Sequence, residues 1–142
     1  MSERVDIYLH FKDNAAEAAK FYSEVFDKKA AVMKYAEFPE SDKMEGIDLD
    51  KVGHAEITFD NLNLMFSDVP GMEITLSNNF SISWWTDEEA RFHKIWKRFV
   101  EGGSTVHEET MQTFFATLYG RIEDPFGISW LLMYNHQDEQ EG

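Results

Sequence analysis

The chain has 142 residues, of which 27 are acidic and 13 basic, so its formal net charge is −14. Such a surface repels phosphate backbones, and we expect no nucleic-acid partner because that binding depends on cations that neutralise phosphates. Cysteine is absent, which excludes disulfides, thiolate zinc sites and a cysteine nucleophile. No apolar run reaches about 18 residues and no signal-peptide pattern opens the chain, so we expect no membrane association and a cytoplasmic location.

The first half of the chain predicts a strand, a helix and three further strands. Residues 5–11 are apolar and aromatic, as in a strand. Asn14-Ala-Ala-Glu17 follows as a capping box, and apolar residues then recur at helical spacing. Strands are expected over residues 30–38, 54–59 and 62–66, and Asp60-Asn61 is typical of a hairpin turn between the last two.

The second half repeats this order. A strand is expected over residues 80–85, and Thr86-Asp-Glu-Glu89 is a second capping box before another amphipathic helix. Gly102-Gly103 ends that helix. The strands that follow are expected over residues 105–107, 116–122 and 128–134. We therefore predict one domain over residues 1–142, made of two modules at about 1–68 and 79–136, with a disordered acidic tail at 137–142.

Two stretches carry a family resemblance: NAAEAAKFYSEVF at 14–26 and YGRIEDPFGISWL at 119–131. Together with the repeated element order and the closing D-P-F-G turn, they resemble the glyoxalase/bleomycin-resistance superfamily, also called vicinal oxygen chelate proteins. Within it they are similar to the PhnB-like branch, which often carries a 3-demethylubiquinone methyltransferase-like label. No G-x-G-type loop for a methyl donor supports that label.

The resemblance implies an α+β fold, in which two βαβββ modules form a curved mixed sheet around a cleft with the helices outside. It also implies that the usual working unit is a homodimer. Metal-dependent members bind one divalent ion, a Lewis acid, through side chains of four strands. The matching positions here are Ile7, Met65, Phe80 and Leu131. None of these side chains suits a hard divalent cation, so no cofactor is predicted.

What remains is an apolar cleft, which would suit a small apolar or aromatic ligand. The resemblance and strand alternation assign to it Ile7, Leu9, Met65, Phe80, Ile82, Trp84, Ser129, Leu131 and Met133, with Trp130 beneath a helix. The same residues could instead simply fill a core. Arg121 could hold an anionic group of the ligand, although a salt bridge to Glu123 or another acid is the commoner role for such a cation.

His54 and Glu56 are the remaining candidates for catalysis. They stand two apart in a predicted strand and therefore point the same way, as a ligand pair or a general base with its orienting carboxylate. A polar pair on the sheet surface is the commoner outcome. We expect His10 to pack beneath a helix, and it could alternatively join His54 and Glu56 around one divalent metal ion. The functional alternatives are thus a metal-independent binding protein, a metal-dependent lyase or dioxygenase with this displaced site, and a drug-sequestering resistance protein.

Overall fold

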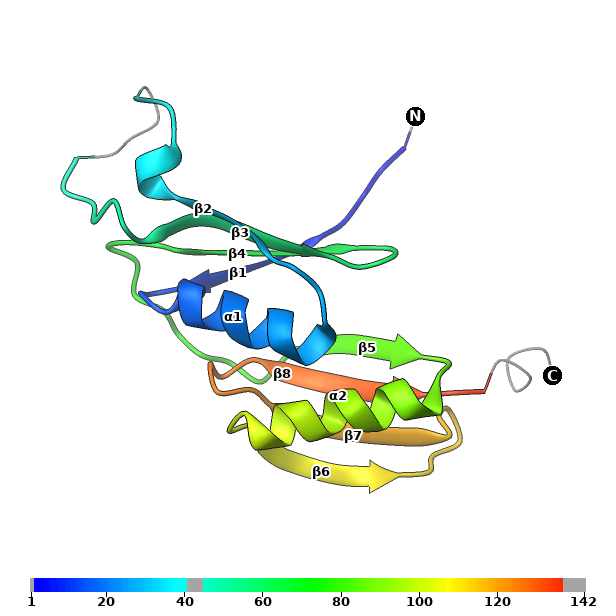
Figure 1. Cartoon of the computed structure of the whole chain (residues 1–142). Coiled ribbons are helices and arrows are strands. Elements are labelled where there is room, and N and C mark those ends of the chain that lie inside the picture. The colour runs from blue at the N-terminus through cyan, green and yellow to red at the C-terminus, as the bar shows by residue number, and fades with distance from the viewer. Residues whose placement is uncertain (1, 41–44, 137–142) are drawn as a thin grey trace. The chain divides into compact units, whose positions relative to one another are not determined.

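The computed structural model describes residues 2–40 and 45–136, and the predicted tail at 137–142 lies outside them. The chain divides into two compact units, Met1–Thr75 (unit 1) and Leu76–Gly142 (unit 2), and each contains one module (Figure 1). The elements of unit 1 are β1 (Ile7–Phe11), α1 (Ala15–Phe26), β2 (Ala31–Lys34), the 3₁₀ helix η1 (Tyr35–Glu37), β3 (Val52–Thr58) and β4 (Asn63–Asp68). Those of unit 2 are β5 (Ile82–Thr86), α2 (Glu89–Glu101), β6 (Thr105–Met111), β7 (Leu118–Glu123) and β8 (Ser129–Tyr134).

The two units share one topology. Sheet 1 has the strand order β1-β4-β3-β2 and sheet 2 the order β5-β8-β7-β6. In each sheet the first strand of the module runs parallel to the last, while the other pairs are antiparallel. The predicted α+β fold with two βαβββ modules is confirmed, and the strands form two four-stranded mixed sheets.

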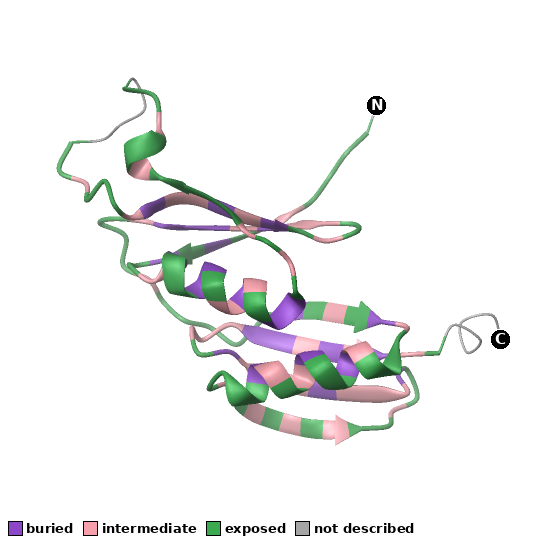
Figure 2. Cartoon of the chain, viewed as in Figure 1, coloured by how far each residue is buried: buried purple, intermediate pink, exposed green. Residues whose placement is uncertain are grey.

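Each helix covers one face of its own sheet with the apolar stripe that the sequence predicts. Ala15, Ala18, Ala19, Tyr22 and Phe26 of α1 are all buried, and so are Phe92, Ile95 and Phe99 of α2. In Figure 2, buried positions recur along both helices. In unit 1, Tyr22 meets the ring of Phe66 edge-on, with centroids 5.8 Å apart. In unit 2, Phe99 lies 5.4 Å from Trp130, which packs beneath α2 as predicted.

Both predicted capping boxes are wrong in detail. Asn14 is the N-cap of α1, but its side chain makes no capping hydrogen bond. Instead the backbone N–H of Ala15 donates to Oδ1 of the buried Asp68, 2.9 Å away. The second helix begins at Glu89 rather than directly after Thr86, whose hydroxyl oxygen accepts the Glu88 N–H at 3.2 Å. A carboxylate from a distant strand has replaced the local cap in unit 1.

One predicted strand is shorter than expected. The strand at 30–38 ends at Lys34 because Tyr35–Glu37 turns into the 3₁₀ helix, where Glu37 accepts the Lys34 N–H at 2.7 Å. No helix in the described part of the chain is long and apolar enough to cross a membrane.

Candidate functional site

Each sheet has one face under its own helix and a far face, which we define as the face that points away from that helix. In sheet 1 the parallel pair β1–β4 and the antiparallel pair β3–β4 fix the membership of both faces. The far face of sheet 1 carries Tyr8, His10, His54, Glu56, Asn63, Met65 and Ser67.

Two sequence-based assignments in β1 are wrong. Ile7 and Leu9 do not share a face with Met65: they pair with the buried Leu64 and Phe66 on the helix side. His10 is exposed on the far face and does not lie beneath α1. The physical reason is that the larger apolar residues of β1, which continue to Phe11, go to the face where the helix excludes water.

A chain of hydrogen bonds crosses the far face of sheet 1. Oη of Tyr8 lies 3.2 Å from Nδ1 of His54, and Nε2 of His54 lies 3.0 Å from Oε1 of Glu56. Asn63 donates its side-chain N–H to the other oxygen of Glu56 at 3.1 Å. The pair that the sequence indicated is therefore real, and Tyr8 and Asn63 extend it. Tyr8 was missed because it lies 46 residues from His54 in sequence, although strand alternation alone would place it opposite Leu9. Asn63 lies only seven residues from Glu56, across the predicted hairpin, so strand pairing could have found it.

The far face of sheet 2 is more apolar and is organised in cross-strand rows. One row places Tyr119 beside Met133 and Met133 beside Trp85. The next places Arg121 beside Leu131 and Leu131 beside Ser83. Leu131 and Met133 are half-buried, while Trp85 is 42% exposed. The predicted cleft residues Leu131 and Met133 thus share this face with Arg121. The same face also carries Tyr119, Trp85 and Ser83, which were not assigned to the cleft from the sequence.

The face assigned to two residues of β5 is also wrong. Ile82 and Trp84 pair with the buried Trp130 and Leu132 on the helix side of sheet 2. Phe80 precedes β5 and is half exposed. The serines at alternate positions, Ser81 and Ser83, are the signal that could have placed Ile82 in the core. Of the two adjacent tryptophans, Trp85 is the one on the far face.

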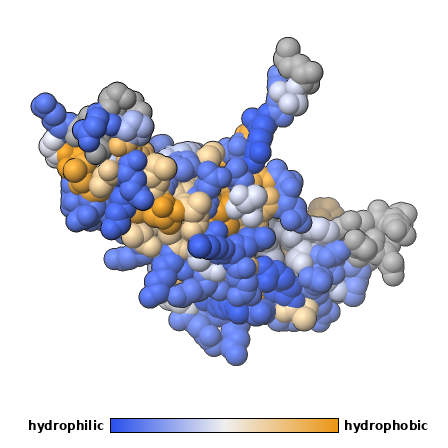
Figure 3. Space-filling model, turned by 45° about the horizontal axis from the view of Figure 1, so that its top comes forward, coloured by the Kyte–Doolittle hydropathy of each residue, from blue (hydrophilic) through white to orange (hydrophobic). Residues whose placement is uncertain are grey.

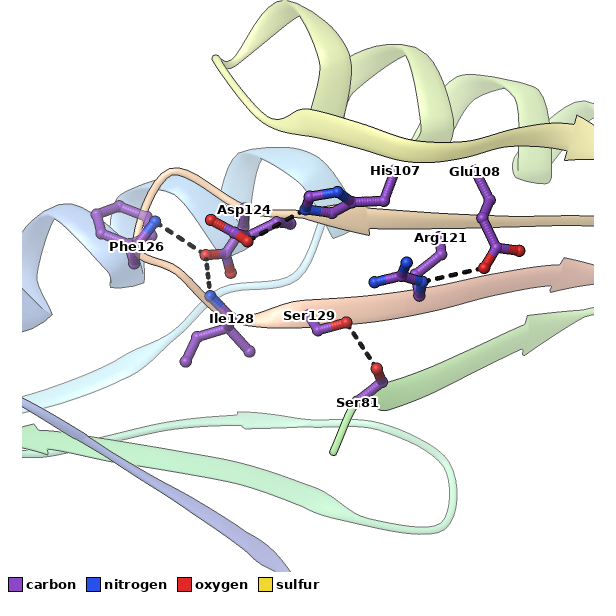
Figure 4. Close-up of polar contacts among 9 residues, drawn as sticks. Ser81, His107, Glu108, Arg121, Asp124, Phe126, Ile128 and Ser129 are labelled. Atoms are coloured by element: carbon purple, nitrogen blue, oxygen red, sulfur yellow. Dashed lines mark hydrogen bonds and ion pairs between the residues drawn. The ribbon is translucent and has the colours of Figure 1, made fainter. Parts of the chain in front are cut away.

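Arg121 forms a salt bridge to an acidic residue, which is the commoner of the two roles expected for it. Its Nε donates to Oε1 of Glu108 at 3.2 Å, and the two side chains are each about a third exposed (Figure 4). Burial raises the pKa of Tyr119, and the Glu108 carboxylate raises it further. Glu123 instead meets His107, 3.2 Å away. Arg121, Tyr119 and Glu108 therefore place polar groups at the border of the apolar row.

The D-P-F-G turn is held by hydrogen bonds to the side chain of its aspartate. Asp124 is buried, and its Oδ1 accepts the backbone N–H groups of Phe126 at 2.9 Å and Ile128 at 3.0 Å (Figure 4). Its Oδ2 accepts the indole N–H of Trp130 at 3.0 Å. Gly127 supplies the positive φ of 86° that the turn requires. Ser129, just after the turn, meets the hydroxyl of Ser81 at 2.6 Å.

The residues do not fit a divalent metal at the positions implied by the family resemblance. Ile7 lies on the helix side, and a shift of one residue to the far face would substitute only the phenol of Tyr8. Met65 and Leu131 offer no hard donor. No three His, Asp or Glu side chains within residues 2–40 and 45–136 gather as a metal site requires. His54 is also unsuited to a displaced site, because both ring nitrogens are engaged by Tyr8 and Glu56.

Comparisons with known proteins cover nearly the whole chain. The family model described as 3-demethylubiquinone-9 3-methyltransferase matches residues 3–133. No curated protein sequence matches. Among solved structures, protein PA1353 from Pseudomonas aeruginosa is 27% identical with a TM-score of 0.80, over 96% of this chain and 100% of that one.

Two further structures are similar in fold. A PhnB protein from Bacillus cereus is 20% identical with a TM-score of 0.72, over 93% of this chain and 99% of that one. The fosfomycin resistance protein FosX from Listeria monocytogenes, solved with Mn(II) and 1S,2S-dihydroxypropylphosphonic acid, is 13% identical with a TM-score of 0.66, over 99% of this chain and 97% of that one. These two show a shared fold only.

Proposed function

We infer that this chain binds a small apolar or aromatic molecule without a metal. It belongs to the family described as 3-demethylubiquinone-9 3-methyltransferase, in the PhnB-like branch of the glyoxalase/bleomycin-resistance superfamily. The observation that carries this proposal is the far face of sheet 2. There the row of Tyr119, Met133 and Trp85 offers a partly exposed apolar surface on rigid strands.

The chemistry of this face favours an aromatic ligand with an anionic group. Flat rings pack well on indole and phenol rings, and the methionine side chain adapts to irregular shapes. Arg121 stands in the neighbouring row with one N–H committed to Glu108. A guanidinium has five N–H donors, so it can hold a carboxylate or sulfonate as well. The face of the molecule seen in Figure 3 is mainly hydrophilic, with separate apolar patches.

The test uses 1-anilinonaphthalene-8-sulfonate, which combines an aromatic body with one anionic group. Its fluorescence, titrated against the wild-type protein, should show saturable binding. Leu131→Asp should weaken that binding at least about tenfold, since a carboxylate would face the ligand in an apolar site. Arg121→Gln should weaken it by a smaller factor through loss of the charge-assisted hydrogen bond.

The matched control is Val100→Asp, which places the same charge on an exposed apolar position of α2 in the same unit. It should leave binding unchanged. Equal losses in Leu131→Asp and Val100→Asp, or binding that neither changes, would contradict a ligand site on the far face of sheet 2.

The second part of the proposal is a homodimer, which is supported by exposed aromatic residues between β6 and β7. Phe114 is 100% exposed and stacks edge-on with Phe115, 5.2 Å away. Large exposed apolar patches on soluble proteins commonly mark interaction sites. Sedimentation equilibrium should give about twice the 16.6 kDa chain mass. Phe114→Ser should shift the equilibrium towards the monomer, and a wild-type monomer at micromolar concentration would refute the dimer.

A further inference from the structure

The hydrogen-bonded chain on the far face of sheet 1 has a defined direction. Glu56 is a carboxylate that accepts from Asn63 through Oε2, and its Oε1 lies 3.0 Å from Nε2 of His54. A carboxylate only accepts, so Nε2 of His54 carries the proton. In the neutral imidazole Nδ1 is then an acceptor, and it receives the hydroxyl proton of Tyr8 across 3.2 Å.

The outer end of this chain is open to a ligand. Tyr8 is 39% exposed, while the side chains of His54 and Glu56 are 35% and 31% exposed. The Tyr8 ring lies 5.4 Å from the ring of His10 and 5.7 Å from that of His54, so three aromatic rings gather there. Met65 lies beside both Tyr8 and Glu56 in the sheet and gives the same surface an apolar floor.

The inner end is fixed by the strands. The backbone N–H of Asn63 donates to Asp6 at 3.0 Å, which ties the start of β4 to the segment before β1. The side-chain oxygen of Asn63 is buried without a hydrogen-bond partner among the described residues, whereas its side-chain N–H donates to Glu56. Asn63 and Glu56 are thus positioning residues for His54, which in turn faces Tyr8.

We propose that Tyr8, His54 and Glu56 form a metal-independent acid–base site for a small molecule with an ionisable hydroxyl group, such as a phenol or an enol. This site consists of residues of sheet 1 alone, and its test does not depend on the ligand proposed for the far face of sheet 2. The oxygen of Tyr8 is the atom that meets the ligand. His54 accepts the proton that Tyr8 releases, and Glu56 stabilises the resulting imidazolium.

The proton transfer balances without a co-reactant. The ligand O–H bond breaks and a new O–H bond forms on Tyr8, while the former Tyr8 proton moves to Nδ1 of His54. The products are a ligand oxyanion and an imidazolium paired with the Glu56 carboxylate. The reverse transfer returns the proton, so the site can act as a base and then as an acid.

Unit 2 provides an internal comparison. His107 and Glu123 form a similar imidazole–carboxylate pair at 3.2 Å. In the described part of the chain, no tyrosine hydroxyl bonds to the His107 ring. A carboxylate-bound histidine is therefore common to both pairs, and the phenol at the open end distinguishes the pair in sheet 1.

The test is acetylation of Tyr8 by p-nitrophenyl acetate, followed by peptide mass spectrometry at a fixed neutral pH. The Tyr8 oxygen attacks the acetyl carbon, the proton passes to His54, and p-nitrophenolate leaves. General-base assistance typically contributes about 10²–10⁴-fold. His54→Gln keeps an N–H donor for Glu56, but its amide oxygen is far too weak a base to take the Tyr8 proton in place of the ring nitrogen. It should therefore slow acetylation of Tyr8 at least about tenfold. His107→Gln should leave that rate unchanged.

Equal rates of Tyr8 acetylation in wild type and His54→Gln would overturn the proposal, and so would an equal fall in His107→Gln. A measurement on the unmodified protein covers the case in which His54→Gln does not fold. Nitrogen-15 NMR of neutral His54 should show the tautomer with the proton on Nε2. A proton on Nδ1 would leave Tyr8 without an acceptor and would equally refute the proposal.

Discussion

Asp68 organises unit 1 at the scale of single residues. It is 1% exposed, and its two oxygens accept the N–H of Ala15 at the start of α1 and the N–H of Val52 at the start of β3, each at 2.9 Å. Its backbone carbonyl accepts the hydroxyl of Tyr35 at 2.5 Å. One residue at the end of β4 therefore joins a helix, a strand and the 3₁₀ helix.

Removal of this carboxylate should strongly destabilise the protein. Asp68→Ala leaves two buried N–H groups without an acceptor, and hydrogen bonds to charged groups are worth about 1.5–3 kcal/mol each. We expect a loss of roughly 3 kcal/mol or more in the free energy of unfolding, measured by urea denaturation. Asp13→Ala removes an exposed acid at the same helix end and should change stability by less than about 0.5 kcal/mol. Similar losses in both variants would show that Asp68 has no such role.

Tyr35 predicts how stability changes at alkaline pH. Burial raises its pKa above the usual 10.0, with smaller contributions from Tyr8 and Asp68. Above pH 10 the unfolded tyrosine ionises while the folded one stays neutral, so the stability that Tyr35 contributes is complete below that pH and is lost as pH rises through the folded pKa. Tyr35→Phe should be about 1 kcal/mol less stable at pH 7, through loss of the hydrogen bond to Asp68.

The difference between wild type and Tyr35→Phe should narrow above pH 10, as measured by chemical denaturation at several pH values. A difference that widened there would contradict the raised pKa of Tyr35.

The candidate site was only partly predictable at this scale. His54 and Glu56 share a face because alternation along one strand is local information. The far-face positions of Tyr8 and Trp85 depend on which side of the sheet the helix covers. The carried-over metal positions pointed to the wrong side in β1 and β5, whereas the polar residues between the apolar ones, such as Ser81 and Ser83, indicated the correct one.

At the scale of elements, a glycine determines how closely α2 approaches its sheet. A Cβ at Gly120 of β7 would lie 2.5 Å from the Trp96 ring and 3.2 Å from the carbonyl oxygen of Glu108. Trp96 also stacks on Phe92 one turn earlier in α2, with ring centroids 6.2 Å apart. The absence of a side chain on β7 therefore allows the indole to cover this strand.

Gly120→Ala should cost about 1–3 kcal/mol of stability through overpacking. Trp96→Leu removes the ring that would clash, so the cost of Gly120→Ala should fall by at least about 1 kcal/mol in that background. A double-mutant cycle based on urea denaturation measures this coupling. Strict additivity of the two substitutions would mean that Trp96 does not limit the residue at position 120.

Helix faces were predicted correctly from sequence, and so was Asn14 as the N-cap of α1, but the hydrogen bonds that cap the two helices were not. The apolar stripe of α1 follows from local spacing, and Ala15, Ala18, Ala19, Tyr22 and Phe26 along it are all buried. The start of α1 depends on Asp68, which is 53 residues from Ala15 in sequence. No local motif contains that partner, so the capping box at Asn14 was a reasonable but incorrect prediction.

At the scale of the whole molecule, the repeated element order was enough to predict two βαβββ modules. Each module brings its first strand beside its last, and this pairing places Tyr8 beside Met65 and Ser83 beside Leu131. The family resemblance implies that metal-dependent members of the superfamily bind their metal through side chains of the corresponding strands. Here the paired residues supply a phenol, a thioether, a hydroxyl and an isobutyl group, which suit small-molecule contacts and proton transfer better than a hard cation.

The metal content of the untagged protein, purified without chelators and then soaked with zinc, nickel, manganese or iron(II), tests the central claim most directly. After removal of free ions, mass spectrometry of the acid-digested sample should find far less than one metal ion per chain, because these sheet faces lack a set of hard ligands. Near-stoichiometric retention of any one of these ions would contradict metal-independent function and would direct attention to His10, His54 and Glu56.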